Sequence, residues 1–430
     1  MGPQLVQFKR SHSGSAGPDA VGRLCQGLFD SLPRADQRRK AELYVRGLLT
    51  ARGRKTMRNI AAHAGMPAGE QSLHHFISCS TWDWRPVREA LAAQLDGLLN
   101  LRAWVVKPMV IPKSGIHSVG VGRSFDAESG HMVNGQQAFG AWAASEEASV
   151  PVNWALHLPE ETTLAGCAAR AVLDVAGARS LRPLPVVVDA VDGGPELLPH
   201  RLGAAGVPFM MAVPAATSLY VTDPQLPGLH GGLVTAGRVM DAAGPLRRPV
   251  RYEDRASRSV GISFVAALQA ELPDPAGPRT AGGRVASRRP LLLIGEWAEA
   301  GRRPERYWLT DLTTAPPALL MRLAQLSRRI ETGAVNTADR VGMRDFEGRS
   351  FQGWHRHVTL ASAAQAALAT PVQAAQWCGA GQARGHGVRP GFEGGYDRMA
   401  GFAGIGGGGV LAGTAPFGGE GGHAMRRRSA

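Results

Sequence analysis

The stretch LPVVVDAVDGG, residues 184–194, decides the fold of this 430-residue chain. Three consecutive valines after a proline are typical of a strand buried on both faces, and the glycine pair predicts a turn after it. Asp189 directly follows the valines, so we expect its carboxylate at the rigidly held end of this strand. The pattern predicts a mixed α/β sheet with an acid at the edge, and a carboxylate there is suited to bind a metal ion.

The hydrophobic period changes upstream of this strand. Residues 21–101 place apolar side chains at helical spacing, as in ADQRRKAELYVRGLLTARG, whereas later segments such as SVPVNWALHLP alternate with period two. We therefore predict an all-helical N-terminal domain at residues 21–101. A sheet domain is predicted at residues 102–370.

The sequence downstream predicts an insertion, a helix and a tail. Residues from about 215 to 290 are rich in Pro, Gly and Arg and contain short strand-like pieces, which indicates a β-rich insertion into the sheet domain. The segment PALLMRLAQLSRRIETGAV that follows has the apolar spacing of a helix and carries Glu331. Residues 1–20 and 371–430 are polar or Gly-rich without a periodic apolar face, and we predict that they are disordered tails.

The charge balance points to a polyanionic partner. Lys and Arg number 48 against 35 Asp and Glu, which gives a net charge of +13. Such a balance favours nucleic acid ahead of a membrane surface. No apolar run reaches the roughly 18 residues of a membrane span, and the N-terminus lacks the apolar centre of a signal peptide. We expect a cytoplasmic, nucleoid-associated protein with no membrane partner.

One segment of the helical region is a candidate for DNA binding. TMRNIAAHAGMPAGEQSLHHFIS, residues 56–78, has the helix, Gly-containing turn and helix of a helix-turn-helix. An ordinary helical hairpin with solvated arginines fits the pattern equally well. If it binds DNA, the basic residues at its start, Arg54, Lys55 and Arg58, are the candidates for contact.

Asp189 and Glu331 are the candidate catalytic and metal-binding residues. Mg²⁺ prefers carboxylate oxygens, and acids converging from different elements are a usual way to bind a catalytic metal pair. In the alternative, structural interpretation, Asp189 caps the turn after its strand and Glu331 pairs with Arg328 or Arg329. Spacing alone leaves both interpretations open.

A lysine and a proline interrupt the strand pattern of WVVKPMVIPKSGIHSVGV, residues 104–121. Lys107 and Pro108 bring a charge and a strand breaker to a position where a buried strand carries neither without a reason.

The chain resembles bacterial insertion-sequence transposases with a DDE superfamily endonuclease domain, in particular the insertion sequence 701 group, which is related to the insertion sequence 4 group. The likeness runs from about Leu24 to Leu368 and its last motif is the most distinctive. In chain order, the motifs that carry it are LPRADQRRKAELYVRGLLTARGRKTMRNIAAHAG, LHHFIS with WDWRPVR, PKSGIHSVGV, SVPVNWALHLPEE, VVVDA with GG, RRIE, and EGRSFQGWHRHVTL.

The resemblance implies an RNase H-like sheet and two-metal chemistry with Mg²⁺ or Mn²⁺. By its motifs, Asp189 matches the second acid and Glu331 the third, with a β-rich insertion between them. The first acid is expected where this chain has Lys107 and Pro108. The family's usual Arg four residues before the glutamate is Ser327 here, and its usual Lys seven residues after is Ala338. Asp126 or Glu128 on the next strand are the candidates to replace the missing acid.

Further residues of the matched motifs have two interpretations. Arg349 and Arg356 contact DNA or brace the helix that carries the third acid. The paired histidines contact phosphate or pack inside the protein, because neither pair has a third ligand at metal-binding spacing. These pairs are His74 with His75, and His355 with His357.

Two functions follow from the resemblance. The first is a transposase that binds double-stranded DNA, both the terminal repeats of the element and its target, and that cuts and joins phosphodiesters. A homodimer is the expected form of such an enzyme. The second is a transposase-derived DNA-binding or regulatory protein that has lost cleavage. The number of acids at the site discriminates between them.

Overall fold

The computed structural model describes most of the chain between residues 20 and 369. The described ranges are 20–66, 68–126, 129–178, 180–189, 197–254, 259–274, 279–280, 283–284, 289–299 and 301–369. Apart from Ala20, the tails predicted at residues 1–20 and 371–430 lie outside these ranges. The described residues all fall within one compact unit, residues 1–389.

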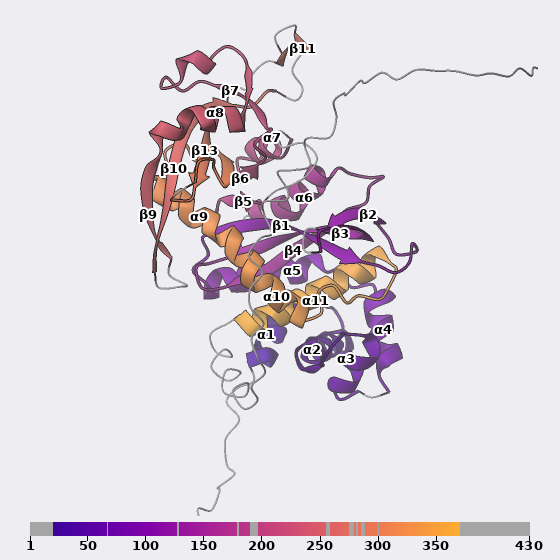
Figure 1. Cartoon of the computed structure of the whole chain (residues 1–430). Coiled ribbons are helices and arrows are strands. Elements are labelled where there is room, and N and C mark those ends of the chain that lie inside the picture. Colours follow the sequence, from indigo (N-terminus) through magenta and orange to yellow (C-terminus); the bar gives the residue numbers. More distant parts are fainter. Residues whose placement is uncertain are drawn as a thin grey trace, which may run out of the picture. The chain divides into compact units, whose positions relative to one another are not determined.

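Five strands form the part of the sheet that positions the site. They are β1 (Ala103–Pro112), β3 (His131–Ala144), β4 (Ser149–Leu156), β5 (Val186–Val188) and β6 (Phe209–Val213), in the spatial order β4-β3-β1-β5-β6. The pairs β3–β4 and β1–β3 are antiparallel, whereas β5 runs parallel to both β1 and β6. This mixed α/β sheet is the fold class predicted from the sequence, and its order is consistent with the RNase H-like arrangement (Figure 1).

Strands from the later part of the chain lengthen the same sheet. β14 pairs with β6, β13 with β14, and the long strand β10 with β13, all antiparallel. Of these strands, β10 belongs to the region of about 215–290 predicted as a β-rich insertion, whereas β13 and β14, which connect it to β6, lie beyond that region. The remaining strands are β2 (Val121–Asp126), β7 (Ser218–Val221), β8 (Leu233–Thr235), β9 (Arg248–Asp254), β10 (Ser259–Glu271), β11 (Arg279–Thr280), β12 (Gly283–Arg284), β13 (Leu291–Trp297) and β14 (Arg306–Thr310).

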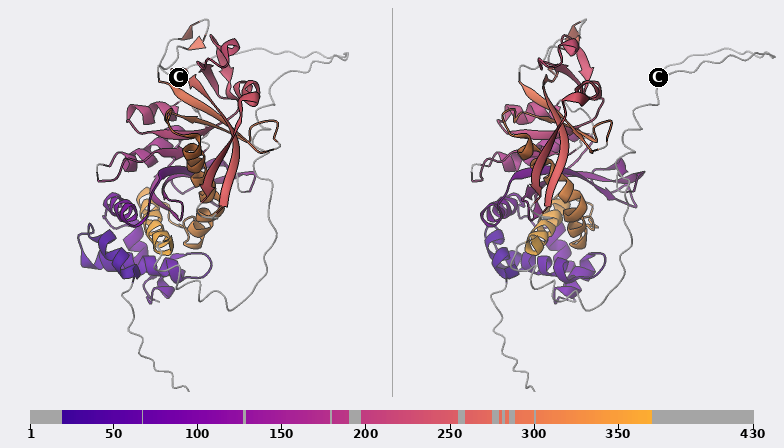
Figure 2. Two further views of the ribbon diagram at one scale, coloured as in Figure 1. Left: turned by 90° about the vertical axis from the view of Figure 1, so that its left-hand side faces the viewer. Right: turned by 60° about the vertical axis from the view of Figure 1, so that its left-hand side comes forward.

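Helices occupy the described part of the N-terminal region, and one C-terminal helix packs among them. α11 (Phe351–Ala369) contacts α2, α4, α5 and strand β4. Its small side chains are buried nearly all round, so the N-terminal helices and the sheet share one continuous hydrophobic core. Figure 2 shows this helix, in yellow, beside the indigo helices of the N-terminal region. The N-terminal helices are α1 (Ala20–Phe29), α2 (Ala35–Thr50), α3 (Met57–His63), α4 (Glu70–Ser78) and α5 (Arg85–Leu98).

The predicted helix, turn and helix of residues 56–78 are α3 and α4. Thr56 caps α3, because its side chain accepts a hydrogen bond from the amide of Asn59. Gly65 has φ +74°, a left-handed conformation that glycine adopts without strain, so the chain turns there towards α4.

The helix that carries the third candidate acid packs on the sheet. α9 (Pro317–Arg329) contacts β1, β5, β6 and β9, and its buried face repeats at helical spacing through Leu320, Leu323 and Leu326. The other helices are α6 (Leu164–Ala176), α7 (Leu197–Ala204), α8 (Ala236–Ala243) and α10 (Val335–Arg340), with short 3₁₀ turns at Pro227–Leu229 and Gly244–Leu246.

Candidate functional site

Parallel pairing of β1 with β5 places Lys107 beside Asp189. The register pairs Val106 with Val188, and the amide of Asp189 donates to the carbonyl of Val106 at 3.3 Å. The next residues along the two strands are Lys107 and Asp189, so their side chains leave the sheet on the same face. The position that sequence comparison assigned to a first acid is therefore adjacent to Asp189.

Pro108 fits in β1 because its neighbouring strand has ended. The amide of Trp104 donates to Pro185 at 3.0 Å, so the even-numbered residues of β1 face β5. Pro108 faces the same side but lies past Val188, the last residue of β5. Its missing N–H therefore removes no hydrogen bond from the β1–β5 ladder.

Glu331 reaches the same point from a π-helical turn. The α-helical pattern of α9 ends at Arg329 and Ile330–Ala334 form a π-helical segment. π-helical turns are rare and occur frequently at functional sites. This turn brings Glu331 to the end of β5, so the structure places both candidate acids together.

The Lys107 ammonium lies between the two carboxylates. Its Nζ donates to Oδ2 of Asp189 and lies 2.8 Å from Oε1 of Glu331. Ser327 also donates to Asp189 Oδ2, at 3.1 Å, and Arg306 Nη2 lies 3.6 Å from Glu331 Oε2. The side chains of Lys107 and Asp189 are 7% and 11% exposed, so their ion pair is largely shielded from solvent, whereas the Glu331 side chain is 29% exposed.

The electrostatics favour this arrangement over a protonated carboxylate. Burial acts to raise the pKa of Asp189, but the charge of Lys107 and its hydrogen bond outweigh burial and hold that pKa below its ordinary value. Asp189 is thus ionised at neutral pH and paired with an ammonium. The lysine supplies the positive charge that two neighbouring carboxylates require.

These residues do not fit a pair of divalent metals. Two-metal sites need several carboxylates that face the metals. Here the Lys107 ammonium lies between the carboxylates of Asp189 and Glu331 and pairs with both. Within the part of the chain that the structure describes, no group of three or more His, Cys, Asp or Glu side chains could hold a metal ion.

The replacement acids expected from the sequence do not complete the site. Asp126 pairs with His131 in the β2–β3 ladder, whereas Lys107 pairs with Gly140. His131 and Gly140 lie nine residues apart along β3, which corresponds to roughly 30 Å of extended strand. Glu128 lies outside the described residues.

Arg328 and Arg329, which the structural alternative pairs with Glu331, also bind other groups. Arg328 Nη2 donates to Glu296 at 2.7 Å, and Arg329 donates to the backbone carbonyl of Glu146. Arg322 also pairs with the Glu146 side chain. These arginines tie α9 to the sheet and fix the start of the turn that carries Glu331.

Sequence analysis missed Arg306 and Glu296. Glu296 is 2% exposed and accepts hydrogen bonds from Ser263 at 3.0 Å and Trp308 at 3.3 Å, besides its pair with Arg328. Neither residue stands in a recognisable motif. Their roles depend on the pairing of β10, β13 and β14, which no local pattern reveals.

Several family-like motifs meet at one buried guanidinium, that of Arg88 in α5. Arg88 donates to Thr359 Oγ1 at 2.7 Å, to Asn153 Oδ1 at 2.8 Å and to the carbonyl of Trp154 at 2.9 Å, and contacts His355 Nδ1 at 3.0 Å. Burial lowers the pKa of Arg88 to about 9. The motifs WDWRPVR, SVPVNW and GWHRHVTL are therefore tied together inside the protein.

Two of the predicted DNA contacts are corrected by burial. Arg356 is 5% exposed and donates to the carbonyls of Ile77 at 3.0 Å and Trp82 at 3.2 Å. Lys55 is 6% exposed, and its Nζ donates to the carbonyl of Ala51. Because these groups bond to backbone inside the protein, we assign them to bracing.

Three predicted contacts remain at the surface. Arg54, Arg58 and Arg349 are exposed, and Arg54 lies 3.8 Å from Glu347. Burial and the charge of Arg54 lower the pKa of nearby Lys113, so a second cation lies close to this surface.

The two histidine pairs differ in burial: one is inside the protein and the other is at the surface. His357 is buried between the hydroxyl of Tyr44, 2.9 Å away, and the carbonyl of Gly342, 2.8 Å away, and burial lowers its pKa to about 4. His355 stacks on Trp84. His74 and His75 on α4 are exposed. The buried pair packs inside the protein, as one interpretation of the sequence predicted.

The chain matches a known protein family over part of its length. Residues 27–184 match the family described as DDE superfamily endonuclease, a transposase-type family whose nucleases act on DNA and generally use divalent metal ions. The match includes Lys107 and ends before Asp189. No curated protein matches the chain. None of the described helices is both long and apolar enough to cross a membrane.

Proposed function

We propose that this transposase-related protein binds double-stranded DNA through its N-terminal helical region and does not cut it. The observation that carries the proposal is the Lys107 ammonium, which pairs with Asp189 and Glu331 at the place where divalent metals would have to bind. Metal entry would face a positive charge and would have to break two ion pairs, of which the one between Lys107 and Asp189 is buried. Of the two functions left open by the sequence, this geometry favours the DNA-binding or regulatory one.

The proposal includes the finer family assignment and the expected partners. The sequence motifs resemble those of the insertion sequence 701 group, so the DNA expected is that of element ends. A homodimer suits such DNA, because two element ends are bound together, and binding would associate the protein with the nucleoid. These expectations rest on analogy with the family.

The DNA-binding half of the proposal rests on charge at the surface. The net charge is +13, and Arg54 and Arg58 are exposed at the start of the segment with helix-turn-helix layout. Arg349 is also exposed and lies two residues after Glu347, which is 3.8 Å from Arg54. Phosphate contacts of this kind release counterions, so affinity should fall steeply with salt.

We expect Arg58→Gln to weaken binding of duplex DNA about threefold to tenfold and to reduce the slope of log affinity against log salt by about one. Fluorescence anisotropy with a labelled duplex at several salt concentrations measures both quantities. Arg238→Gln is the matched control, because Arg238 is also exposed but lies on α8 in the inserted region. An unchanged slope in the Arg58 variant, or a flat salt response of the wild type, would contradict the proposed DNA surface. Recovery of the duplex uncut after incubation with Mg²⁺ is expected in the same experiment.

A further inference from the structure

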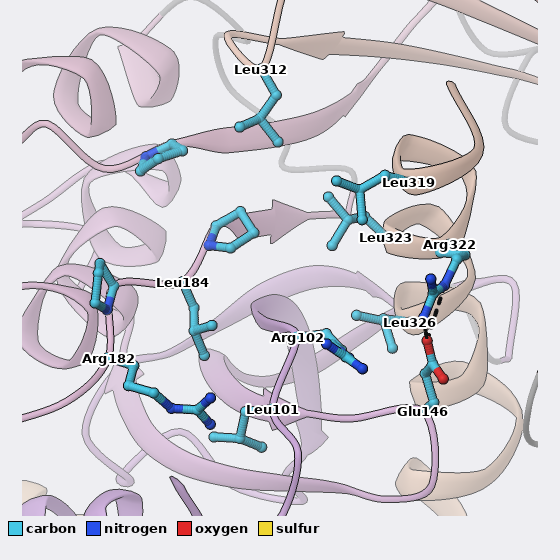
Figure 3. Close-up of a pocket in the computed structure, with 13 residues that line it drawn as sticks. Leu101, Arg102, Glu146, Arg182, Leu184, Leu312, Leu319, Arg322, Leu323 and Leu326 are labelled. Atoms are coloured by element: carbon cyan, nitrogen blue, oxygen red, sulfur yellow. Dashed lines mark hydrogen bonds and ion pairs between the residues drawn. The ribbon is translucent and has the colours of Figure 1, made fainter. Parts of the chain in front are cut away.

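A pocket lies at the N-terminal ends of the central strands, whereas Asp189 lies at the C-terminal end of β5. The pocket has a volume of about 420 Å³ and is lined by residues at the starts of β1, β5 and β6, with α9 along one side (Figure 3). Leu101 precedes β1, Leu184 precedes β5 and Pro208 precedes β6. Parallel strands thus bring their N-terminal ends together around the pocket, whereas Asp189 follows the C-terminal end of β5.

The lining is almost entirely apolar. Backbone donors at this edge are already used, because Trp104 N donates to Pro185 at 3.0 Å and Val186 N donates to Pro208 at 2.8 Å. Prolines in the lining have no N–H to offer. Polar recognition in the pocket must therefore come from charged side chains. The apolar lining residues are Leu101, Leu184, Leu312, Leu319, Leu323, Leu326, Pro183, Pro185 and Pro208.

The charged residues of the pocket differ in their partners. Arg322 pairs with Glu146, and Arg182 pairs with Asp96 at 2.7 Å. The guanidinium of Arg102 has no ion pair among the described residues, and its Nε is buried without a hydrogen-bond partner. The terminal Nη atoms of Arg102 are not among the buried atoms and have no partner among the described residues, so they are the groups in this pocket that a ligand would pair with.

We propose that the pocket binds an apolar molecule with a single carboxylate, such as a medium-chain fatty acid. Guanidinium binds a carboxylate with two parallel hydrogen bonds, and a monoanion balances the one unpaired charge of Arg102. The Glu146 carboxylate in the lining disfavours a more highly charged ligand. The leucines enclose the apolar tail, and the volume lies within the range of small-molecule sites.

Calorimetry on the full chain with three probes tests the proposal. Octanoate carries the tail and the charge, 1-octanol carries the tail alone, and acetate carries the charge alone. We expect saturable binding of one octanoate per chain, roughly tenfold weaker binding of octanol, and no measurable binding of acetate. Absence of saturable octanoate binding, or equal affinity for octanoate and octanol, would overturn the proposal.

Two arginine variants distinguish the contribution of the Arg102 charge to octanoate binding from that of another arginine in the pocket lining. Arg102→Gln should weaken octanoate binding about tenfold and leave octanol binding unchanged. Arg182→Gln is the matched control and should change octanoate affinity less than about twofold, because that guanidinium already pairs with Asp96. An equal loss in both variants would overturn the role of Arg102. If thermal melting shows that Arg102→Gln does not fold, the wild-type comparison of octanoate with octanol decides.

Discussion

Replacing Lys107 by methionine is expected to lower the free energy of unfolding by about 3 kcal/mol at pH 7. Methionine retains much of the length of the side chain but removes the ammonium that Asp189 and Glu331 share. The two carboxylates then face each other without the ammonium between them, and a buried charge left without its partner is strongly destabilising. Urea unfolding followed by tryptophan fluorescence measures the change.

The pH dependence of this loss has a defined sign. In the wild type the pKa of Asp189 lies below its ordinary value of 3.8, so its stabilising contribution is present above that value and is lost as the pH falls. Without Lys107, burial raises the pKa of Asp189, and protonation then relieves the repulsion. The difference between wild type and variant should therefore shrink as the pH is lowered towards about 3.

A surface lysine supplies the matched control for this experiment. Lys40 lies 3.6 Å from Asp36 on α2, in an exposed pair one helical turn apart. Lys40→Met should change stability by less than about 0.5 kcal/mol. If Lys107→Met is no more destabilising than Lys40→Met, the buried ion pairs are not what holds the site together.

Replacing Lys107 by aspartate is expected to create a divalent metal site. The change exchanges an ammonium for a carboxylate beside Asp189 and Glu331, so three acids converge from β1, the end of β5 and the π-helical turn. Mn²⁺ affinity at this site should rise at least about 100-fold over the wild type, because a repulsive charge next to the metal becomes a ligand. Electron paramagnetic resonance of free Mn²⁺ during titration measures the affinity.

A second substitution identifies the site of this binding. Lys107→Asp with Asp189→Asn should lose most of the gained affinity, since one of the three acids is removed without a change of shape. Asp126→Asn in the Lys107→Asp background is the control, because Asp126 lies on the β2–β3 hairpin away from Lys107. Equal Mn²⁺ affinity of wild type and Lys107→Asp would show that Lys107 is not what keeps metal out.

The sequence predicted the strand and helix that carry the acids but not the ion pairs between them. The valines before Asp189 and the periodicity before Glu331 are strong local signals, and the motif order placed Lys107 at the position of the first acid. That Lys107 bonds to both acids depends on the β1–β5 register and on the π-helical turn. Neither is encoded in a pattern short enough to recognise.

Burial of basic residues was the least predictable feature. Lys55 and Arg356 stand in polar, basic segments that resemble a DNA-binding surface, yet both bond to backbone carbonyls inside the protein. Arg356 reaches its carbonyls because α11 packs against the N-terminal helices, and the amide of Lys55 donates to Asp345 at 2.8 Å, so both depend on contacts between residues far apart in the chain. For Arg356, a nearby tryptophan in the chain's motifs was an indication of burial, because its guanidinium lies over the Trp82 ring.

This chain differs from the family pattern at two other positions, Ser327 and Ala338. Ser327 donates to Asp189, so this position bonds to the acid through a hydroxyl. Ala338 is 4% exposed and packs in the core. Ser327 is therefore a neutral group at a site where Lys107 and Arg306 supply positive charge, whereas Ala338 belongs to the core.

We propose that Lys107 leaves Asp189 and Glu331 unable to support metal-dependent cleavage. The most direct test is cleavage of a supercoiled plasmid that carries the DNA flanking the gene, with Mg²⁺ or Mn²⁺, by the wild type and by Asp189→Ala. We predict that the wild type nicks this DNA no faster than Asp189→Ala does. Metal-dependent cutting by the wild type that disappears in Asp189→Ala would contradict the account.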